Sequence, residues 1–335
     1  MSGIVHGGNL AAARAQYGEP EGGWLDLSTG INPHGYPIPS IPPDAWLRLP
    51  EDDGLEAQAA AHYGVIDARG VLPIAGSQAA IRTLPSLLPR GRAGIAQIGY
   101  SEYAPAFARA GHDVVPLPEA AFLGDVPNDV QHLVVVNPNN PTARLLPAET
   151  LRNWHRRLHA RGGTLIVDEA FIEAFNDGPT LAPLAGVPGL VVLRSIGKFY
   201  GLAGARIGFA LAAPELVSAL REALGHWTVN GPARAVVRAT LADTAWQVST
   251  RAQLQPAGAR LSALLDRHGL PNAATPLFAW ASAPRAQALH ASLARLGIWT
   301  RLFDAPISGL RFGLPPDEPG WQRLADALAS LSHSA

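Results

Sequence analysis

The sequence contains a single lysine, Lys198, within the stretch "SIGKFYGLAG". Lysine and arginine together number 26, so the remaining 25 of these residues are all arginines. Arginine can replace lysine as a surface cation, but its guanidinium stays protonated and cannot act as a nucleophile. A lysine amine can lose its proton and form an imine with a carbonyl compound. The retained lysine therefore predicts imine chemistry, and a surface lysine left by chance is the structural alternative.

Pyridoxal phosphate is the cofactor most commonly held by such a lysine, and its pyridine nitrogen needs an acidic partner. Asp168 follows the apolar run "TLIV" and is suitably placed, although a helix cap or a buried ion pair is its alternative role. The cofactor phosphate needs free N–H groups at the start of a helix, which the stretch "AGSQAAI" offers. We expect the phosphate to be held there and by the two residues that bracket the lysine, a set made of Gly76, Ser77, Gln78, Ser195 and Arg206.

Short apolar runs alternate with helical segments between residues 71 and 195, which is the pattern of a parallel sheet covered on both faces. The runs are "VLPIAG", "AGIAQI", "HDVVPL", "HLVVVN", "TLIVDEA" and "GLVVLRS". A further run, "ARIGFALA", is expected to add an antiparallel strand. The fold class is thus α/β, with a mostly parallel central sheet flanked by helices. Ligands bind at the carboxyl ends of such strands, where the sequence places Asn137, Asn140, Asp168, Ser195 and Lys198.

Three regions are predicted along the chain. Residues 1–45 are rich in glycine and proline and read as an extended, loop-like arm that packs with the small domain and a partner subunit. Residues 46–225 form the large cofactor-binding domain. Residues 226–335 form a small α+β domain, which a helical stretch over 214–268 leads into.

Composition excludes several classes of function. The formal net charge is −1 and no basic run is present, so we expect no nucleic-acid partner. No cysteine is present to supply thiolate chemistry, and no metal site is predicted. The apolar runs are too short to cross a bilayer, which argues against a membrane partner. Because the N-terminus lacks the pattern of a secretory signal, we expect a cytoplasmic protein.

Four motifs in order, "AGSQAAI", "VVNPNNPTA", "IVDEAF" and "SIGKFYGLAGARIGF", resemble those of the fold-type I pyridoxal-phosphate enzymes, the aspartate-aminotransferase superfamily. The resemblance spans nearly the whole chain. The opening, "HGGNLAAARAQYG" with "WLDLSTGINPHGYP", looks like that of the threonine-phosphate decarboxylases of cobalamin biosynthesis, relatives of histidinol-phosphate aminotransferase.

The resemblance implies a role for each matching residue. Lys198 would form the aldimine and later move protons, and Asp168 would pair with the pyridinium. Asn140 would bind the phenolic oxygen of the cofactor ring, and Tyr100 would stack on the ring face. Arg311 would bind the substrate carboxylate. The candidates for binding the substrate phosphate are His6, Asn9, Thr29, Asn32 and Arg301.

Two positions depart from the family pattern. Related aminotransferases usually carry a tyrosine at the position of Phe171, whose hydroxyl reaches the phenolic oxygen of the cofactor. They often also carry a tyrosine that reaches the partner subunit's cofactor phosphate, where this chain has Leu49. The ring electronics would therefore depend more on Asn140, and one contact across a subunit interface is in doubt.

The implied reaction is the decarboxylation of O-phospho-L-threonine, a phosphorylated amino acid, to (R)-1-aminopropan-2-yl phosphate by way of an external aldimine. The protein would then be a lyase of cobalamin biosynthesis and a homodimer. A histidinol-phosphate-type aminotransferase is the alternative enzyme, because both reactions begin in the same way. A catalytically silent pyridoxal-phosphate-binding regulatory module is a third reading, and the absence of a basic domain ahead of the arm argues against it.

Overall fold

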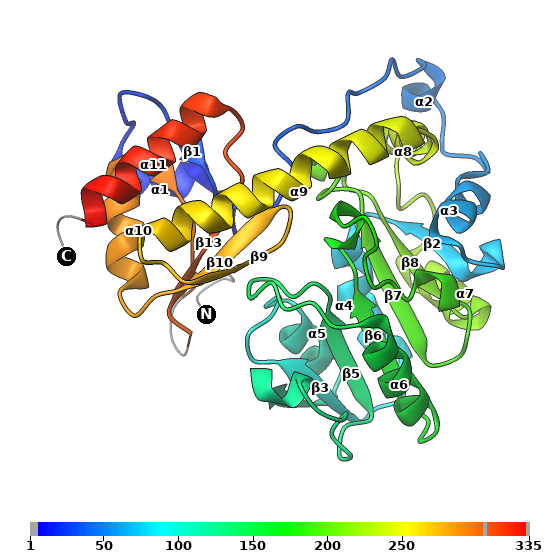
Figure 1. The fold of residues 1–335 in the computed structure, drawn as a ribbon. Coiled ribbons are helices and arrows are strands. Elements are labelled where there is room, and N and C mark those ends of the chain that lie inside the picture. Colours follow the sequence, from blue (N-terminus) through cyan, green and yellow to red (C-terminus); the bar gives the residue numbers. More distant parts are fainter. Residues whose placement is uncertain (1–5, 304–306, 333–335) are drawn as a thin grey trace. The chain divides into compact units, whose positions relative to one another are not determined.

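The computed structural model describes residues 6–303 and 307–332 (Figure 1). The chain divides into two compact units. The large unit comprises residues 35–140 and 144–248, and the small unit comprises residues 1–34, 141–143 and 249–335. Within the described residues, no helix is both long enough and apolar enough to span a membrane.

A seven-stranded sheet forms the centre of the large unit. Its strands lie in the order β2 (Val71–Ile74), β8 (Gly208–Ala212), β7 (Leu190–Ser195), β6 (Thr164–Asp168), β5 (His132–Val136), β3 (Arg92–Ala96) and β4 (Asp113–Leu117). Only β8 runs antiparallel to its neighbours, β2 and β7. Every residue of β5, β6 and β7 is buried, as the apolar runs predicted. The predicted α/β class, the mostly parallel sheet and the antiparallel strand near 205–212 are all confirmed.

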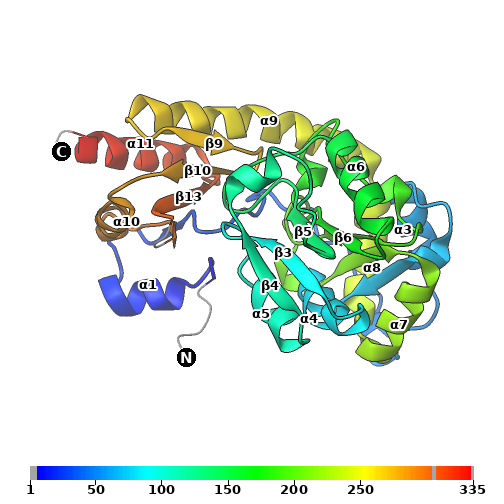
Figure 2. The ribbon, with the colours of Figure 1, turned by 90° about the horizontal axis from the view of Figure 1, so that it is seen from below.

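Helices cover the sheet of the large unit. On one face, the helices α4, α5 and α7 pack against the strands in a single buried hydrophobic cluster. Its members include Ile81, Leu84, Phe107 and Leu220 from the helices and Val134 and Ile166 from the strands. The helix α6 buries its own apolar stripe and packs on β6. Figure 2 shows α4, α5 and α7 on one side of the strands and α6 on the other. The helices of this unit are α2 (Asp44–Leu47), α3 (Leu55–Tyr63), α4 (Ser77–Leu87), α5 (Tyr103–Arg109), α6 (Ala148–His159), α7 (Pro214–Leu224) and α8 (Gly231–Ala242).

The small unit contains two sheets. The arm forms β1 (Leu25–Asp26), which pairs in parallel with β11 (Ile298–Trp299). The second sheet has the order β12 (Arg301–Phe303), β13 (Gly309–Gly313), β10 (Phe278–Ser282) and β9 (Asn272–Ala274). In the arm, the Leu27 N–H donates a 2.8 Å hydrogen bond to the Trp299 carbonyl, and the Leu27 carbonyl accepts a 2.7 Å hydrogen bond from the Gly313 N–H. The helices are α1 (Leu10–Tyr17), α10 (Ala286–Arg295), α11 (Glu318–Ser332) and α9 (Thr244–Arg267), which begins in the large unit.

The arm contains a helix that the sequence analysis did not predict. The helix α1 has the alanine-rich sequence "LAAARAQY", and the side chain of Asn9 caps it by accepting a 3.1 Å hydrogen bond from the Ala12 N–H. Alanine has the highest helix propensity and asparagine is among the best N-caps, so local sequence accounts for this helix. The expectation of a loop-like arm over residues 1–45 was therefore wrong at α1.

The boundaries between the units also differ from those we expected at 45/46 and 225/226. They fall at 34/35 and, within α9, at 248/249. The helix α8 belongs to the large unit because it packs against α2 and α3, and its Arg234 forms an ion pair with Glu56 at 3.1 Å. The predicted strand "IWTRLF" is split into β11 and β12, which belong to different sheets.

Candidate active site

The nine residues predicted to bind the cofactor all line one pocket of the large unit. Its wall also includes Val136, Ala170, Phe171, Gly197, Ala203 and Ile207, which the sequence analysis did not assign to cofactor binding. Asp168 ends β6 and Ser195 ends β7, while Asn140 follows β5 by four residues. Because β5, β6 and β7 are parallel neighbours, their carboxyl ends meet at one edge of the sheet and bring these residues together.

Asn137 lies at the expected edge, directly after β5, but its side chain has a different role from that of Asn140. Its side chain donates a 3.1 Å hydrogen bond to the Leu146 carbonyl and accepts a 2.8 Å bond from the Leu146 N–H. It does not line the pocket. Asn137 therefore holds the loop that follows β5, whereas Asn140 reaches the pocket wall.

The carboxyl group of Asp168 is buried and held by two donors. The Tyr103 hydroxyl donates to Oδ2 at 2.8 Å, and the Ala170 N–H donates to Oδ1 at 3.1 Å. Burial raises the pKa of this carboxyl above its ordinary value, although the two hydrogen bonds and the charge of Lys198 act in the opposite direction. A positively charged pyridine nitrogen would favour the ionised form further, so the site suits such a partner.

The start of α4 forms a cradle that suits a phosphate group. Gly76 precedes the helix with a φ of 74°, and Ser77 and Gln78 are its first residues. A Cβ atom at Gly76 would lie 2.8 Å from a guanidinium nitrogen of Arg206, so only glycine leaves this space open. Free N–H groups, hydroxyl groups and a guanidinium together are the donors that a phosphate dianion requires.

Tyr100 lies on the pocket wall, and its hydroxyl donates to Gln78 at 3.1 Å. Burial and the nearby charge of Asp168 raise the pKa of this phenol to about 12, so it stays neutral at physiological pH. The rings of Tyr100 and Tyr103 pack edge to face, with centroids 6.3 Å apart. Tyr100 thus offers a neutral ring that is held in place from both ends.

Lys198 is half-buried in the pocket wall. Its Nζ lies 5.6 Å from the centre of the Phe171 ring. Phe171 is buried and lines the same pocket. The position at which this chain departs from the family's usual tyrosine therefore lies in the candidate site. The ring brings apolar surface beside the lysine where related aminotransferases usually have a hydroxyl donor.

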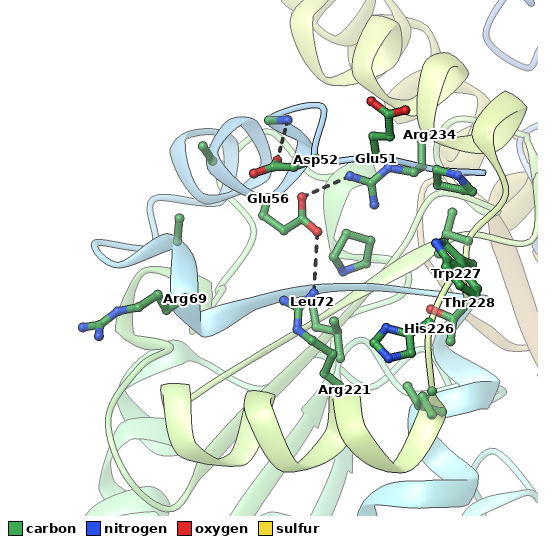
Figure 3. A pocket seen from close by; sticks show the side chains of 18 residues that line it. Glu51, Asp52, Glu56, Arg69, Leu72, Arg221, His226, Trp227, Thr228 and Arg234 are labelled. Atoms are coloured by element: carbon green, nitrogen blue, oxygen red, sulfur yellow. Dashed lines mark hydrogen bonds and ion pairs between the residues drawn. The ribbon is translucent and has the colours of Figure 1, made fainter. Parts of the chain in front are cut away.

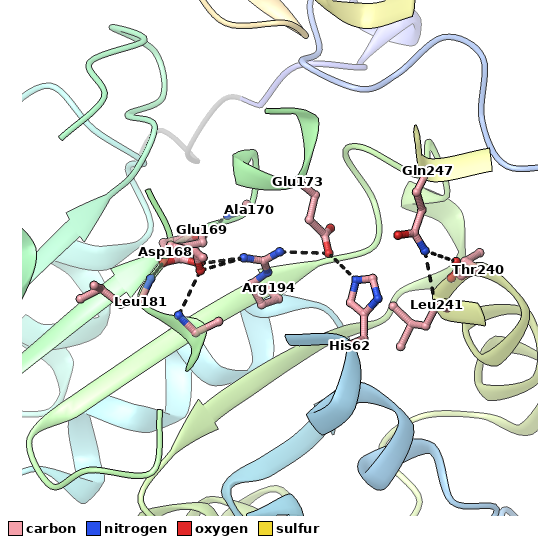
Figure 4. A network of polar contacts seen from close by, with 12 residues as sticks. His62, Asp168, Glu169, Ala170, Glu173, Leu181, Arg194, Thr240, Leu241 and Gln247 are labelled. Carbon is pink, nitrogen blue, oxygen red and sulfur yellow. Dashed lines mark hydrogen bonds and ion pairs between the residues drawn. The ribbon is translucent and has the colours of Figure 1, made fainter. Parts of the chain in front are cut away.

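A buried network of charges lies next to the pocket residues in sequence (Figure 4). Arg194 donates a 2.7 Å hydrogen bond to Glu169 and forms a 3.1 Å ion pair with Glu173. Glu169 also accepts a 2.6 Å bond from Thr180, and His62 lies 3.6 Å from Glu173. Since Glu169 follows Asp168 and Arg194 precedes Ser195, this network fixes the ends of the two strands that carry the site.

A larger pocket of about 610 Å³ lies elsewhere in the large unit (Figure 3). It includes none of the nine predicted residues. Two of its arginines are engaged by one carboxylate, because Arg234 pairs with Glu56 at 3.1 Å and Arg221 lies 4.0 Å from the same group. The smaller pocket, with its lysine, acid and phosphate cradle, is therefore the candidate active site.

The residues predicted to bind the substrate all belong to the small unit. Arg311 is buried on β13 and donates a 2.6 Å hydrogen bond to the Ser28 carbonyl. Burial and the charge of Arg301, its partner in register on β12, lower the pKa of Arg311 to about 10. Such a destabilised cation favours an anionic ligand.

The other substrate candidates lie in the arm. Asn9 caps α1, and the buried Asn32 accepts a 2.9 Å hydrogen bond from the His34 N–H. A Cβ atom at Gly8 would contact the Thr29 side chain at 3.4 Å, and His6 is exposed. The arm segments "HGG" and "STG" thus lie against each other, beside Arg311.

Comparisons with known proteins identify the family of the chain. Residues 50–324 match the family model described as aminotransferase class I and II. The chain belongs to the aminotransferase class I and II family. This aminotransferase-family chain is 50% identical to a threonine-phosphate decarboxylase of Pseudomonas aeruginosa over 99% of both chains. It is 39% identical to a threonine-phosphate decarboxylase of a Sinorhizobium species, over 98% of both.

Two solved structures show the same fold. A histidinol-phosphate aminotransferase from Sinorhizobium meliloti, in complex with pyridoxal-5'-phosphate, has a TM-score of 0.82 at 20% identity and covers 99% of this chain and 95% of its own. The L-threonine-O-3-phosphate decarboxylase from Porphyromonas gingivalis has a TM-score of 0.76 at 20% identity, covering 92% and 99%. The fold type and the resemblance to threonine-phosphate decarboxylases that the motifs predicted are confirmed.

The buried charge network makes a prediction about stability. Replacing Arg194 with methionine leaves two buried carboxylates without their cation, so the free energy of unfolding should fall by about 3–5 kcal/mol. Urea denaturation at pH 7 measures this loss. The matched control is Arg92→Met, which removes an exposed arginine paired with Asp129 and should cost less than about 1 kcal/mol. Equal losses in the two variants would contradict a structural role for the network.

The same network makes a prediction about pH. Burial alone would raise the pKa of Glu173, but Arg194 and His62 outweigh it and lower the pKa below its ordinary value of 4.5. The stabilisation by Glu173 is therefore fully present above pH 4.5 and is lost as pH falls through the lower pKa of the folded state. Urea denaturation of the Glu173→Gln variant should show a stability deficit that shrinks below pH 4.5. A deficit that is constant down to pH 3 would argue against this ionisation.

Proposed function

We propose that the protein is a pyridoxal-phosphate-dependent decarboxylase that converts O-phospho-L-threonine to (R)-1-aminopropan-2-yl phosphate and carbon dioxide for cobalamin biosynthesis. The observation that carries this proposal is the 50% identity, over 99% of both chains, to a relative named threonine-phosphate decarboxylase. The pocket supports it independently, because it combines a lysine, a buried acid and a phosphate cradle.

Each part of the cofactor has a matching residue. The phosphate would be held by the start of α4 with Ser195 and Arg206, and the ring would lie against Tyr100. Asn140 would bind the phenolic oxygen, Asp168 would accept the hydrogen bond of the ring nitrogen, and Lys198 would hold the aldehyde carbon covalently. When bound, the cofactor supplies an electron sink for the bond that breaks at the substrate's α-carbon.

The residues of the chain then perform three tasks. Asp168 keeps the ring nitrogen protonated, which its buried and hydrogen-bonded carboxylate is suited to do. Arg311 binds the substrate carboxylate until the bond between that group and the α-carbon breaks and carbon dioxide leaves. Lys198 delivers a proton to the α-carbon, so that the product retains its amine. We propose the substrate phosphate is held by residues of the set His6, Asn9, Thr29, Asn32 and Arg301.

We further propose that the protein acts in the cytoplasm as a homodimer. Phosphorylated amino acids carry charges that prevent their crossing a membrane unaided, so substrate and enzyme must share a compartment. For the dimer, a surface of the large unit exposes Ile38, Trp46, Leu47, Leu49 and Trp227. The segments around α2 and the start of α8 adjoin, because Gly231 packs against the Ala45 carbonyl.

These five apolar side chains are between 60% and 81% exposed, which is costly in water unless another surface covers them. We call this set the apolar surface and propose a second copy of the chain as its partner. Beside it in the larger pocket, Arg221 and Arg234 are both engaged by Glu56, so the apolar surface is suited to an apolar rather than a strongly charged partner.

Decarboxylation is tested directly by measuring release of carbon dioxide from O-phospho-L-threonine with cofactor-loaded protein. We expect release from this substrate and a kcat/KM for unphosphorylated L-threonine that is lower by at least about 100-fold, since the charged hydrogen bonds to the phosphate are missing. Protein that releases no carbon dioxide but exchanges amino groups with 2-oxoglutarate would instead be an aminotransferase. Protein that binds the cofactor and turns over no amino acid would support a regulatory module.

The covalent role of Lys198 is tested by borohydride reduction of the cofactor-loaded protein, followed by peptide mass spectrometry. The reduced cofactor should be attached to Lys198 alone. In Lys198→Arg the attachment and the visible absorbance of the linked cofactor should disappear while the fold is kept, because a guanidinium forms no imine. Adding Arg92→Lys to that variant restores a lysine to the chain and should not restore the attachment. A persisting visible band in Lys198→Arg would contradict the assignment.

The dimer is tested by sedimentation velocity. Wild-type protein should sediment as a dimer, and Trp46→Asp should shift it toward a monomer, because burying an unpaired charge in an interface costs several kcal/mol. The control is Leu123→Asp, which changes a side chain of the same unit that is 83% exposed and lies outside the apolar surface. A wild-type protein that remains a monomer at micromolar concentration would contradict the proposal.

A further inference from the structure

Tyr103 lies just behind the pocket and was not among the residues that the sequence predicted for the site. It begins α5, three residues after Tyr100, and is 2% exposed. It does not line the pocket itself. Any influence that it has on a ligand must therefore pass through the residues it contacts, which are Asp168 and Tyr100.

The contact with Asp168 fixes the carboxyl group in space. Its Oδ2 accepts from the Tyr103 hydroxyl at 2.8 Å, and its Oδ1 accepts from the Ala170 N–H at 3.1 Å. Each carboxylate oxygen is held by a donor from a different element, so the carboxyl plane cannot rotate without losing one bond. Because a carboxylate offers about four acceptor positions, a position remains for a further donor.

The contact also favours the charged form of the acid. Burial and the neighbouring carboxylate raise the pKa of the Tyr103 hydroxyl well above its ordinary value, so it remains a donor throughout the physiological pH range. A donor stabilises the ionised carboxylate and opposes the effect of burial, which raises the pKa of Asp168. Lys198 opposes burial from the pocket side, and Tyr103 does so from the protein side.

The Tyr103 ring has a second contact of its own. It packs edge to face against Tyr100 at 78°, and Tyr100 is the ring that lines the pocket wall. One buried side chain therefore supports two groups of the candidate site, an acid and an aromatic face.

We propose that Tyr103 is a positioning residue, whose hydroxyl orients the Asp168 carboxylate and keeps it ionised for a cationic ring nitrogen. The inference rests on the proposed cofactor, but not on which reaction follows. It extends the site by one buried residue that acts through Asp168 and touches neither the cofactor nor the substrate.

The test is Tyr103→Phe, which keeps the ring and removes only the hydroxyl. A hydrogen bond to a charged group is worth roughly a ten- to hundredfold change in an equilibrium constant, so pyridoxal phosphate should bind about tenfold or more weakly. The acidic limb of the binding profile should move to higher pH by about one unit, since the Asp168 carboxylate becomes easier to protonate. Spectroscopic titration of the cofactor-free protein with pyridoxal phosphate, from pH 5 to 9, measures both.

The matched control is Tyr36→Phe. The Tyr36 hydroxyl also donates to a carboxylate, Asp243, at 3.2 Å in the same unit, but neither residue lines the pocket. Because this tyrosine–aspartate hydrogen bond lies outside the pocket, its loss in Tyr36→Phe should leave the affinity for pyridoxal phosphate and the pH dependence of binding unchanged.

A double-mutant cycle with Asp168→Asn separates positioning from packing. If Tyr103 acts through the ionised acid, removing its hydroxyl should weaken binding much less in the Asp168→Asn background. An equal loss of affinity in both backgrounds, or an unchanged affinity and pH profile in Tyr103→Phe alone, would overturn the proposal.

The same cycle on urea unfolding of the cofactor-free protein tests the bond without any ligand. A coupling between the two substitutions in stability is expected, and its absence would overturn the proposal even if one variant folds poorly. Because neither measurement uses the substrate, a failure of decarboxylation would leave the result for Tyr103 intact.

Discussion

A negative charge buried at the end of β6 is the constraint on which the site depends. Asp168 is 4% exposed, and an isolated carboxylate there would be too costly to stay ionised. The structure compensates with a phenol from α5, a backbone N–H from the turn after β6 and an ammonium from the loop after β7. Each of these elements must be in place for the acid to be charged, so the integrity of the fold and the chemistry of the pocket are linked at this residue.

In the neighbouring network, buried charges are likewise compensated by close partners, but their role is structural rather than chemical. Glu169, Glu173 and Arg194 are nearly inaccessible, with Arg194 between the two carboxylates. Apolar residues in these positions would pack at no desolvation cost, but they would not fix the direction in which two strand ends leave the sheet. The edge of the sheet is thus polar and directional, whereas its middle is purely apolar.

The strands and the pocket could be predicted from sequence because both follow simple rules. Buried parallel strands appear as apolar runs, and parallel topology brings the residues after them together, as it does for Asn140, Asp168 and Lys198. Tyr103 was missed because a tyrosine at the start of an apolar helix is also common in an ordinary protein core. The sequence did contain an indication of its role, because Tyr103 is only three residues from Tyr100, a predicted site residue, and so must lie close to it. Arg194 offered a clearer one, because a charge within "VVLRS" requires a buried partner.

The arm was harder to predict because its structure depends on long-range contacts. Leu25 pairs with Ile298, and Arg311 bonds to the carbonyl of Ser28, across more than 270 residues of sequence. From the stretch "HGGN", the sequence analysis named His6 and Asn9 as candidates for binding the substrate phosphate and gave the glycines no role of their own. A Cβ atom on Gly7 would clash with the Ser28 carbonyl oxygen and lie 3.4 Å from a guanidinium nitrogen of Arg311, so close packing accounts for that glycine. The helix α1, which the sequence analysis missed, depends on local propensity and could have been predicted from the arm's own sequence.

The position of Lys198 in the pocket wall has a consequence for the chemical behaviour of the whole molecule. Its amine is the only side-chain amine of the chain, and no cysteine thiol competes with it. Reagents that modify lysine side chains, such as acylating agents, reducing sugars or crosslinking aldehydes, therefore find no lysine on the protein surface outside this pocket. Lys198 is half-buried in the pocket wall, so a ligand that fills the pocket also covers this amine. Reagents that modify lysine side chains should therefore react faster with the empty pocket than with the occupied one.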